Sequence, residues 1–250
     1  MTKQTGLGDR LYVGGFDLSG DVGSLGAIGG GPEAKEVTGI DKSAFERIGG
    51  KRDGRIEFNS WFNPASNQQH DVLAALPRTD VGLLYTRGNV QGAAAAGMVA
   101  KQINYDPTRN DDGSLEWSIE ALANGFGLEW GRLITDGLET ETVAGATAGL
   151  DAGVDVGTTN FGAQLYVQVT AFTGTGVLIG LETSSDDGAG DAYAGVAGTA
   201  SFVAGVGTLR LPSTSATAAI ERYTRVSFSG TFTSVTYVAM LVRNLTARAF

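Results

Sequence analysis

The sequence predicts a mainly β protein: an N-terminal part that mixes strands with one or two short helices, and a C-terminal all-β sandwich of jelly-roll or immunoglobulin-like type. Two observations favour this class. Residues 161–244 consist of short runs of β-branched and aromatic residues separated by Gly, Ser, Thr and Asp turns, at the spacing typical of a sandwich. The 38 glycines and five prolines of the chain indicate many turns and few rigid bends.

The N-terminal part begins with extended segments that glycines interrupt. Strands are expected within residues 10–29, 34–40, 51–62, 79–88, 97–106 and 114–122, and the polar residues 107–114 are expected to form a turn. Residues 41–50 predict a helix that Asp41 or Ser43 would cap and Gly49-Gly50 would end. A second short helix is expected within 66–77, capped by Ser66 or Asn67.

Residues 51–62 carry a predicted turn at Asp53-Gly54, followed by strict alternation of side chains. One predicted face carries Ile56, Phe58, Ser60 and Phe62, and the other carries Arg55, Glu57, Asn59 and Trp61. Residues 114–122 alternate in the same way, so Glu116 and Glu120 share a face. Two readings stay open for these carboxylates: an acidic stripe on one sheet face, or an ordinary solvated face.

The segment 137–160 consists of small and polar residues and contains no aromatic residue, which predicts a linker or a loosely paired edge. The expected organisation is a first domain at 1–140, a linker or edge segment at 141–157 and a C-terminal sandwich at 158–250. Within the sandwich, the alternation over 161–170 predicts a half-buried strand. Residues 236–244 are apolar on both faces, which predicts a central strand covered on both sides.

The composition disfavours several kinds of chemistry. The chain has no cysteine and one histidine, His70, so disulfides, thiolate metal sites and most His-based catalysis are not expected. The acidic segment 186–191 could bind calcium, but a solvated turn is the stronger reading, and the same holds for 110–113. The glycine runs at 29–36 and 173–180 lack the context of a phosphate-binding loop. We therefore expect no enzyme, no catalytic residue, no metal and no cofactor.

The net charge of −9 disfavours DNA binding through released counterions, although DNA could still pass such a surface without adhering. No apolar run approaches the ~20 residues of a membrane span, so no membrane insertion is expected. The first residues show no secretion signal, so the chain is expected to remain in the cytosol of its producer.

Four phrases resemble the major tail tube proteins of long-tailed, siphovirus-type actinobacterial phages. They are GLGDRLYVGGFDLSGDVGSLG, LEWGRLITDG, FGAQLYVQVTAFTGT and RYTRVSFSGTFTSVTYVAMLVRN, in that order over most of the chain. The resemblance implies an N-terminal tube domain whose sheets join in hexameric rings into one continuous β-barrel, with the rings stacked into a hollow tail. It also implies contacts with other tail proteins, passage of genomic DNA through the lumen, and assembly in the host cytoplasm into the virion tail.

Combined with the alternation, the resemblance predicts a set of residues that face the tube lumen. This set comprises Glu57, Asn59, Glu116, Ser118 and Glu120, where carboxylates would repel the phosphates of DNA. The residues between them, Ile56, Phe58, Leu115, Trp117 and Ile119, would fill the core of the tube domain.

Two alternatives to the tube subunit stay open. The C-terminal sandwich could bind a carbohydrate or another ligand on a host cell surface, with Tyr166, Tyr193 and Tyr223 as exposed contacts. The chain could instead decorate a capsid. The ring number, the strands that face the lumen and the host are not determined by the sequence.

Overall fold

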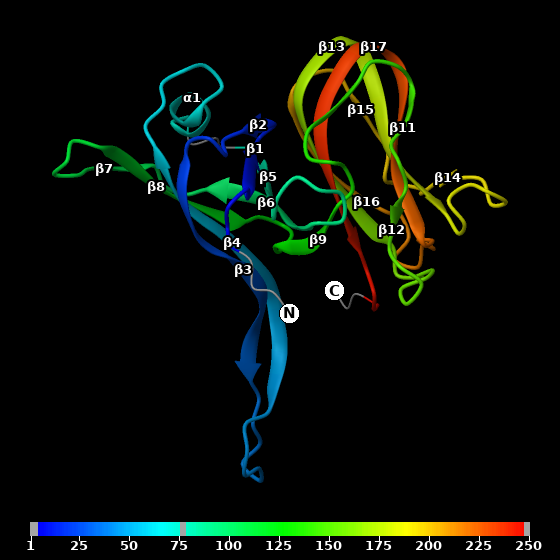
Figure 1. The fold of residues 1–250 in the computed structure, drawn as a ribbon. Coiled ribbons are helices and arrows are strands. Elements are labelled where there is room, and N and C mark those ends of the chain that lie inside the picture. The colour runs from blue at the N-terminus through cyan, green and yellow to red at the C-terminus, as the bar shows by residue number, and fades with distance from the viewer. Residues whose placement is uncertain (1–4, 76–78, 248–250) are drawn as a thin grey trace. The chain divides into compact units, whose positions relative to one another are not determined.

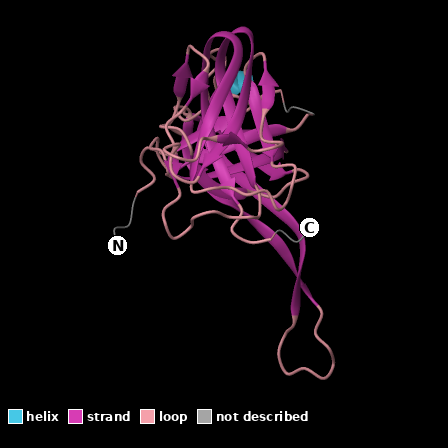
Figure 2. Cartoon of the chain, turned by 90° about the vertical axis from the view of Figure 1, so that its right-hand side faces the viewer, coloured by secondary structure: helices cyan, strands magenta, loops and turns pink. Residues whose placement is uncertain are grey.

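The computed structural model describes residues 5–75 and 79–247, and these residues form a mainly β fold, as the sequence predicts. Figure 2 shows how far strands outnumber helix. The strands are β1 (Arg10–Val13), β2 (Phe16–Asp17), β3 (Val22–Glu36), β4 (Arg47–Trp61), β5 (Val81–Thr86), β6 (Ala94–Gln102), β7 (Asp106–Arg109), β8 (Leu115–Ala123), β9 (Glu129–Leu133), β10 (Glu139–Glu141), β11 (Gly145–Ala146), β12 (Leu150–Asp151), β13 (Ala163–Ser184), β14 (Ala194–Gly195), β15 (Ser201–Val203), β16 (Gly207–Pro212) and β17 (Tyr223–Arg243). The helix is α1 (Gln69–Leu73).

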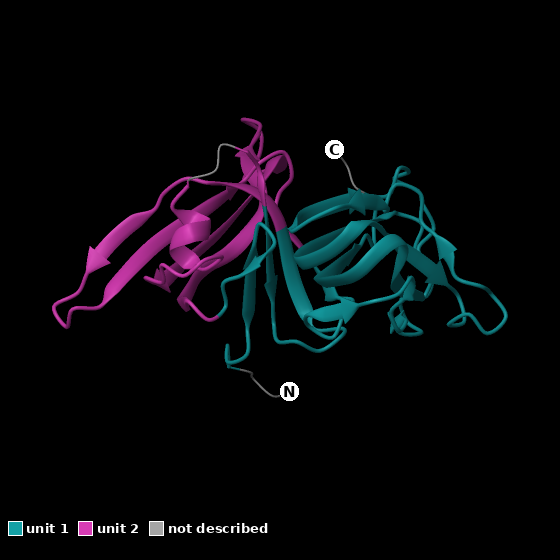
Figure 3. Cartoon of the chain, turned by 90° about the horizontal axis from the view of Figure 1, so that it is seen from above, with its two compact units in different colours: residues 1–19, 82–97, 130–250 teal, residues 20–81, 98–129 magenta. Residues whose placement is uncertain are grey.

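The chain divides into two compact units that interleave along the sequence (Figure 3). The sandwich unit comprises residues 1–19, 82–97 and 130–250, and the hairpin unit comprises residues 20–81 and 98–129. The sequence predicts contiguous ranges instead. The difference arises because β1 and β5, both early in the chain, pair with each other and pack in the sandwich unit.

Two long strands organise the sandwich unit. β13 pairs antiparallel with β17 from Ala163↔Arg243 to Ser184↔Tyr223, with register shifts near residues 169–176. Both strands bend there (Figure 1), so the two halves of β13 contribute to one interior cluster with Leu165, Val167, Val177 and Ile179. β14, β15 and β16 also pair with β13, whereas β9, β10, β11 and β12 pair with β17.

Strand β17 confirms the prediction of a central strand that is covered on both sides, because every residue from Tyr237 to Val242 is buried. The first half of β13 is also buried on both faces, so the prediction of a half-buried strand at 161–170 is wrong. The buried amide of Gln168 in this half bonds to backbone groups instead of water. Gln168 accepts the Gly15 N–H at 2.7 Å and donates to the Gly82 carbonyl at 3.0 Å.

The segment 141–157 forms edge strands of the sandwich, one of the two predicted possibilities. β11 pairs with β17 at Gly145↔Phe228, and β12 pairs with it at Leu150↔Thr224.

The hairpin unit is a sheet in the order β3–β4–β8–β7, with β6 pairing beside β7 on β8. All these registers are antiparallel. The predicted second helix is confirmed as α1, although Gln68 precedes it without a side-chain cap.

The predicted helix at 41–50 is wrong. These residues close the β3–β4 hairpin, where the Val37 N–H donates to the Glu46 carbonyl at 2.9 Å and the Glu46 N–H donates to Thr38 Oγ1 at 3.1 Å. The predicted turn at Asp53-Gly54 is also absent, because β4 runs straight through it and Gly54 pairs with Gly30.

Candidate functional site

The five residues predicted to face a lumen lie together on one face of the hairpin unit. Across the β4–β8 pair, Glu57 stands opposite Glu120 and Asn59 opposite Ser118, while Glu116 stands opposite Trp61. Directly opposed residues of an antiparallel pair share a face. We call this set, with Trp61, the polar face: Glu57, Asn59, Trp61, Glu116, Ser118 and Glu120. All six are half-buried or exposed, so solvent reaches this side of the sheet.

The other face of the same strands is the core of the hairpin unit. Ile56, Phe58 and Ile119 are at most 2% exposed, and Trp117 is 7% exposed, as predicted. Leu115, the fifth predicted core residue, is 38% exposed, so the prediction is wrong for this residue. It is the first residue of β8 and stands opposite the exposed Arg109 of β7, where the strand emerges from the core.

Helix α1 closes one end of this core face. Phe62 stacks on Trp117 with ring centroids 4.9 Å apart and meets the His70 ring edge-on at 5.1 Å. His70 Nδ1 lies 2.8 Å from the Tyr105 hydroxyl. The lone histidine is therefore part of the aromatic packing. With α1 on this side, the polar face is the side of the sheet that α1 does not cover.

Carboxylates prevail on the polar face, although basic groups reduce the charge. Arg55 Nη1 lies 3.0 Å from Glu57 Oε1, and both side chains are partly exposed. Asp106 stands opposite Ser118 and adds another carboxylate next to the face. The opposition of Glu57 and Glu120 is unfavourable for the sheet alone, because like charges directly across a strand pair repel.

The β3–β4 hairpin continues beyond this sheet as an arm, which we define as residues 30–54. The β4–β8 register ends at Arg55, so the arm consists of two strands only, and Figure 1 shows it extending away from the rest of its unit. Its distal end exposes apolar side chains: Ile40 is fully exposed, Phe45 67% exposed and Ile48 54% exposed. Two-stranded hairpins are marginally stable in water, so such an arm benefits from a partner surface.

The arm tip is the feature that sequence reasoning missed. Its signal was the scatter of Val37, Ile40 and Phe45 in a polar stretch rich in turn residues. The sequence instead predicts a strand at 34–40 and a separate helix at 41–50, so it does not predict the hairpin that joins the two segments.

The three tyrosines predicted as exposed ligand contacts differ in their surroundings. Tyr166 is 2% exposed, so this prediction is wrong. It lies in a second apolar cluster, on the opposite side of β13 from Leu165, and Arg210 Nε donates to its hydroxyl at 2.9 Å. Tyr193 and Tyr223 are half-buried beneath guanidinium groups, with Arg225 Cζ 3.9 Å from the Tyr193 ring centroid.

The acidic segment 186–191 is a turn that its own carboxylate holds. Asp186 accepts backbone N–H groups of Ala189, Gly190 and Asp191, and the amide of Asp191 is the main cause of the lowered pKa of Asp186. Within residues 5–75 and 79–247, no three His, Asp or Glu side chains are arranged to hold a metal ion. The same residues contain no helix with the length and hydrophobicity of a membrane span.

No protein-family model matches the chain, and no curated protein sequence matches it. Among solved structures, a chain in the virion of a native gene transfer agent particle aligns with 14% identity and a TM-score of 0.42, over 51% of this chain and 98% of that one. A chain from the C6-symmetric tail of an empty gene transfer agent particle aligns with 16% identity and a TM-score of 0.40, over 52% and 98%. The SPP1 Dit protein, a hub adsorption protein of phages that infect Gram-positive bacteria, aligns with 10% identity and a TM-score of 0.32, over 93% and 98%. Similarities of this size do not establish a shared function.

Proposed function

We propose that this chain is a structural subunit of a phage tail tube, which assembles into stacked rings around a lumen through which DNA passes. The observation that carries the proposal is the polar face. Residues from β4 and β8, far apart in sequence, place Glu57, Asn59, Glu116, Ser118 and Glu120 on the side of one sheet that α1 leaves uncovered. A tube wall needs such a sheet, because one side must form the subunit core and the other must face water and DNA.

The strand order supports ring formation. β3 and β7 are the outer strands of the order β3–β4–β8–β7, and all four residues of β7 are exposed. A strand at the edge of a sheet offers N–H and C=O groups to another chain. If β3 of one copy pairs beside β7 of the next, the contact is head-to-tail, and a ring results where the rotation closes. That the ring contains six copies is what the sequence resemblance implies.

The arm supports contacts beyond a single ring. It exposes Ile40, Phe45 and Ile48 at the end of a two-stranded hairpin, and burying these side chains against another copy would stabilise both. The role proposed for the protein is therefore architectural and not catalytic. Other tail proteins would be its neighbours in the virion, after assembly in the host cytoplasm.

Negative-stain microscopy and sedimentation of the purified chain at increasing concentration test the proposal. We expect rings or hollow tubes. The variant Ile40→Asp with Phe45→Asp should shift the protein towards smaller species. The matched control, Val143→Asp with Val154→Asp, places the same charges at exposed valines of the sandwich unit and should assemble normally. A monodisperse monomer at every concentration contradicts the proposal.

A further inference from the structure

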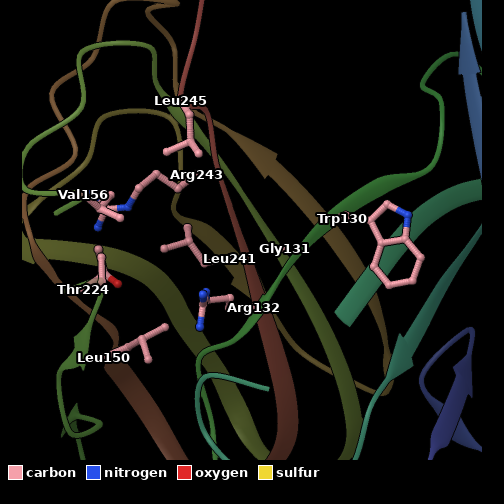
Figure 4. Close-up of a pocket in the computed structure, with 10 residues that line it drawn as sticks. Trp130, Gly131, Arg132, Leu150, Val156, Thr224, Leu241, Arg243 and Leu245 are labelled. Carbon is pink, nitrogen blue, oxygen red and sulfur yellow. The ribbon is translucent and has the colours of Figure 1, made fainter. Parts of the chain in front are cut away.

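The sandwich unit contains a cavity of ≈ 270 Å³ beside the end of β17 (Figure 4). Leu150 of β12, Leu241 of β17, Val156 and Leu245 supply aliphatic walls, and Arg132, Thr224 and Arg243 supply polar groups. In Figure 4 the side chains of Leu150, Val156, Thr224, Leu241 and Arg243 surround a common space. Ligand pockets in proteins have volumes from roughly 300 Å³ upward, so this cavity suits a small ligand.

Two guanidinium groups at this cavity have no carboxylate partner among the described residues. Arg243 donates through Nη1 to the carbonyls of Gly157 and Ile220 and through Nη2 to those of Glu221 and Arg222. Its Nε–H has no acceptor in the described chain, and burial lowers its pKa to about 10. A cation held only by carbonyl dipoles keeps its full charge and attracts an anion.

Arg132 is the second of these cations. Its one hydrogen bond within the described residues runs from Nη1 to the Gly92 carbonyl at 3.3 Å. Acidic residues outnumber basic ones by 27 to 18 in this chain. In such a protein, two arginines without a carboxylate partner at one cavity are a specific local excess of positive charge.

A buried hydroxyl without a partner adds an independent observation. Thr224 is 1% exposed, and its Oγ1 has no hydrogen-bond partner in the described residues. Leaving a buried hydroxyl unsatisfied is unfavourable. Because Thr224 lines the cavity, a molecule bound there could supply the missing hydrogen-bond partner.

The cavity is open to solvent. Leu245 is 63% exposed and Trp130 is 52% exposed at its rim, so a small molecule can enter without unfolding the sandwich.

We propose that this cavity binds a small organic carboxylate with a short aliphatic body. A carboxylate accepts the planar N–H donors of arginine in charge-assisted hydrogen bonds, and the aliphatic walls bury the rest of the molecule. The few free donors at the site suit a monoanion better than a phosphate dianion, which needs more of them. The inference concerns the sandwich unit and does not depend on tube assembly.

NMR titration of the ¹⁵N-labelled full chain carrying Ile40→Asp with Phe45→Asp, the substitutions expected to prevent tube assembly, tests the site with hexanoate, 1-hexanol and inorganic phosphate. We expect hexanoate to shift the amide signals of residues 130–132, 150–156 and 241–245, with an affinity at least about tenfold above that of 1-hexanol. Arg132→Gln should weaken hexanoate binding by about tenfold. Val156→Trp, which fills the cavity, should abolish binding while the other signals stay in place.

Arg109→Gln in the hairpin unit is the control for loss of one positive charge and should bind hexanoate normally. Equal binding of 1-hexanol would overturn the role of the two arginines. Equal or tighter binding of phosphate would overturn the choice of a carboxylate. Absence of any hexanoate binding would overturn the site itself.

Discussion

Arg243 shows how a single cation can link two loop segments of the sandwich unit. Its guanidinium donates to carbonyls at residue 157 and at residues 220–222, so one side chain satisfies two loop segments. Arg243→Met keeps the aliphatic stem but leaves those carbonyls without donors. We expect the free energy of unfolding to fall by about 3 kcal/mol in urea titrations. Arg222→Met, which removes an exposed ion pair with Asp151, should cost clearly less. Equal losses would contradict this role of Arg243.

The Asp151–Arg222 ion pair should make the stability of the fold depend on pH in the acidic range. Arg222 donates to both oxygens of Asp151, at 2.7 and 2.6 Å, and these bonds, with the Gly153 amide, lower the pKa of Asp151 to about 2. A folded-state pKa below the unfolded value means that the carboxylate stabilises the fold above about pH 4, and that this stabilisation is lost between about pH 4 and pH 2. The pair is exposed, so the effect is small and weakens with salt.

Urea midpoints of wild type and Asp151→Asn at about pH 5 and about pH 2 measure this effect. The variant should be less stable at the higher pH, and the difference should shrink at the lower pH. Arg222→Gln should reproduce the same pH dependence, because it removes the other half of the pair. A difference that stays constant with pH would argue against the ion pair.

Strands β4 and β13 show where side-chain alternation predicts burial correctly and where it does not. In β4, the alternation from Arg55 to Trp61 gave the correct faces, because one side of that strand meets the core and the other meets solvent. In β13 the same kind of alternation failed at Tyr166. Gln168 lies in the interior there because backbone groups of Gly15 and Gly82 satisfy its amide. Gly15 is 153 residues away from Gln168 in the sequence. A polar residue with a distant backbone partner cannot be distinguished from a solvated one by pattern.

At the scale of elements, Gly54 decides how β4 passes the edge of its core. A Cβ at this position would lie 2.4 Å from Leu128 N and 2.7 Å from Leu128 Cβ, so no larger residue fits without displacing the backbone. Gly54→Ala should therefore lower the free energy of unfolding by about 2 kcal/mol. Gly29→Ala, at an open position of the paired strand β3, should change it little. Thermal unfolding of both variants is the measurement, and equal effects would refute the steric argument.

The same glycine shows why the elements of the arm could not be predicted from local sequence. Asp-Gly is a turn signal, yet Gly54 is required for close approach to Leu128, a tertiary contact. Asp41, Ser43 and Gly49 match helix caps, but hairpin ends use the same residue types. The long-range pairing of β3 with β4 prevails over these local preferences.

At the scale of the whole molecule, the order of the chain conceals the two units. The sequence shifts composition near residue 140, whereas the last segment of the sandwich unit begins at Trp130, and β9 already pairs with β17 at Leu133↔Met240. It does not show that β1 and β5 pack with strands of the C-terminal half, since that depends on pairings such as Leu11↔Tyr85. Sequence patterns predicted the mainly β class and the polar face, but they could not predict this interleaving.

The polar face leads to a prediction about DNA, which rests on the proposed tube. Glu116→Lys with Glu120→Lys reverses two charges on the face that would line the lumen. Because lysines bind phosphate with release of counterions, we expect assembled tubes of this variant to bind duplex DNA, with affinity falling steeply between about 50 and 200 mM salt. Wild-type tubes should not bind.

The control variant, Asp111→Lys with Asp112→Lys, changes the net charge equally in an exposed turn of the same unit. Fluorescence anisotropy with labelled DNA compares the three proteins. Equal binding by both variants would attribute the effect to net charge, and the polar face would lose its proposed role in keeping DNA mobile.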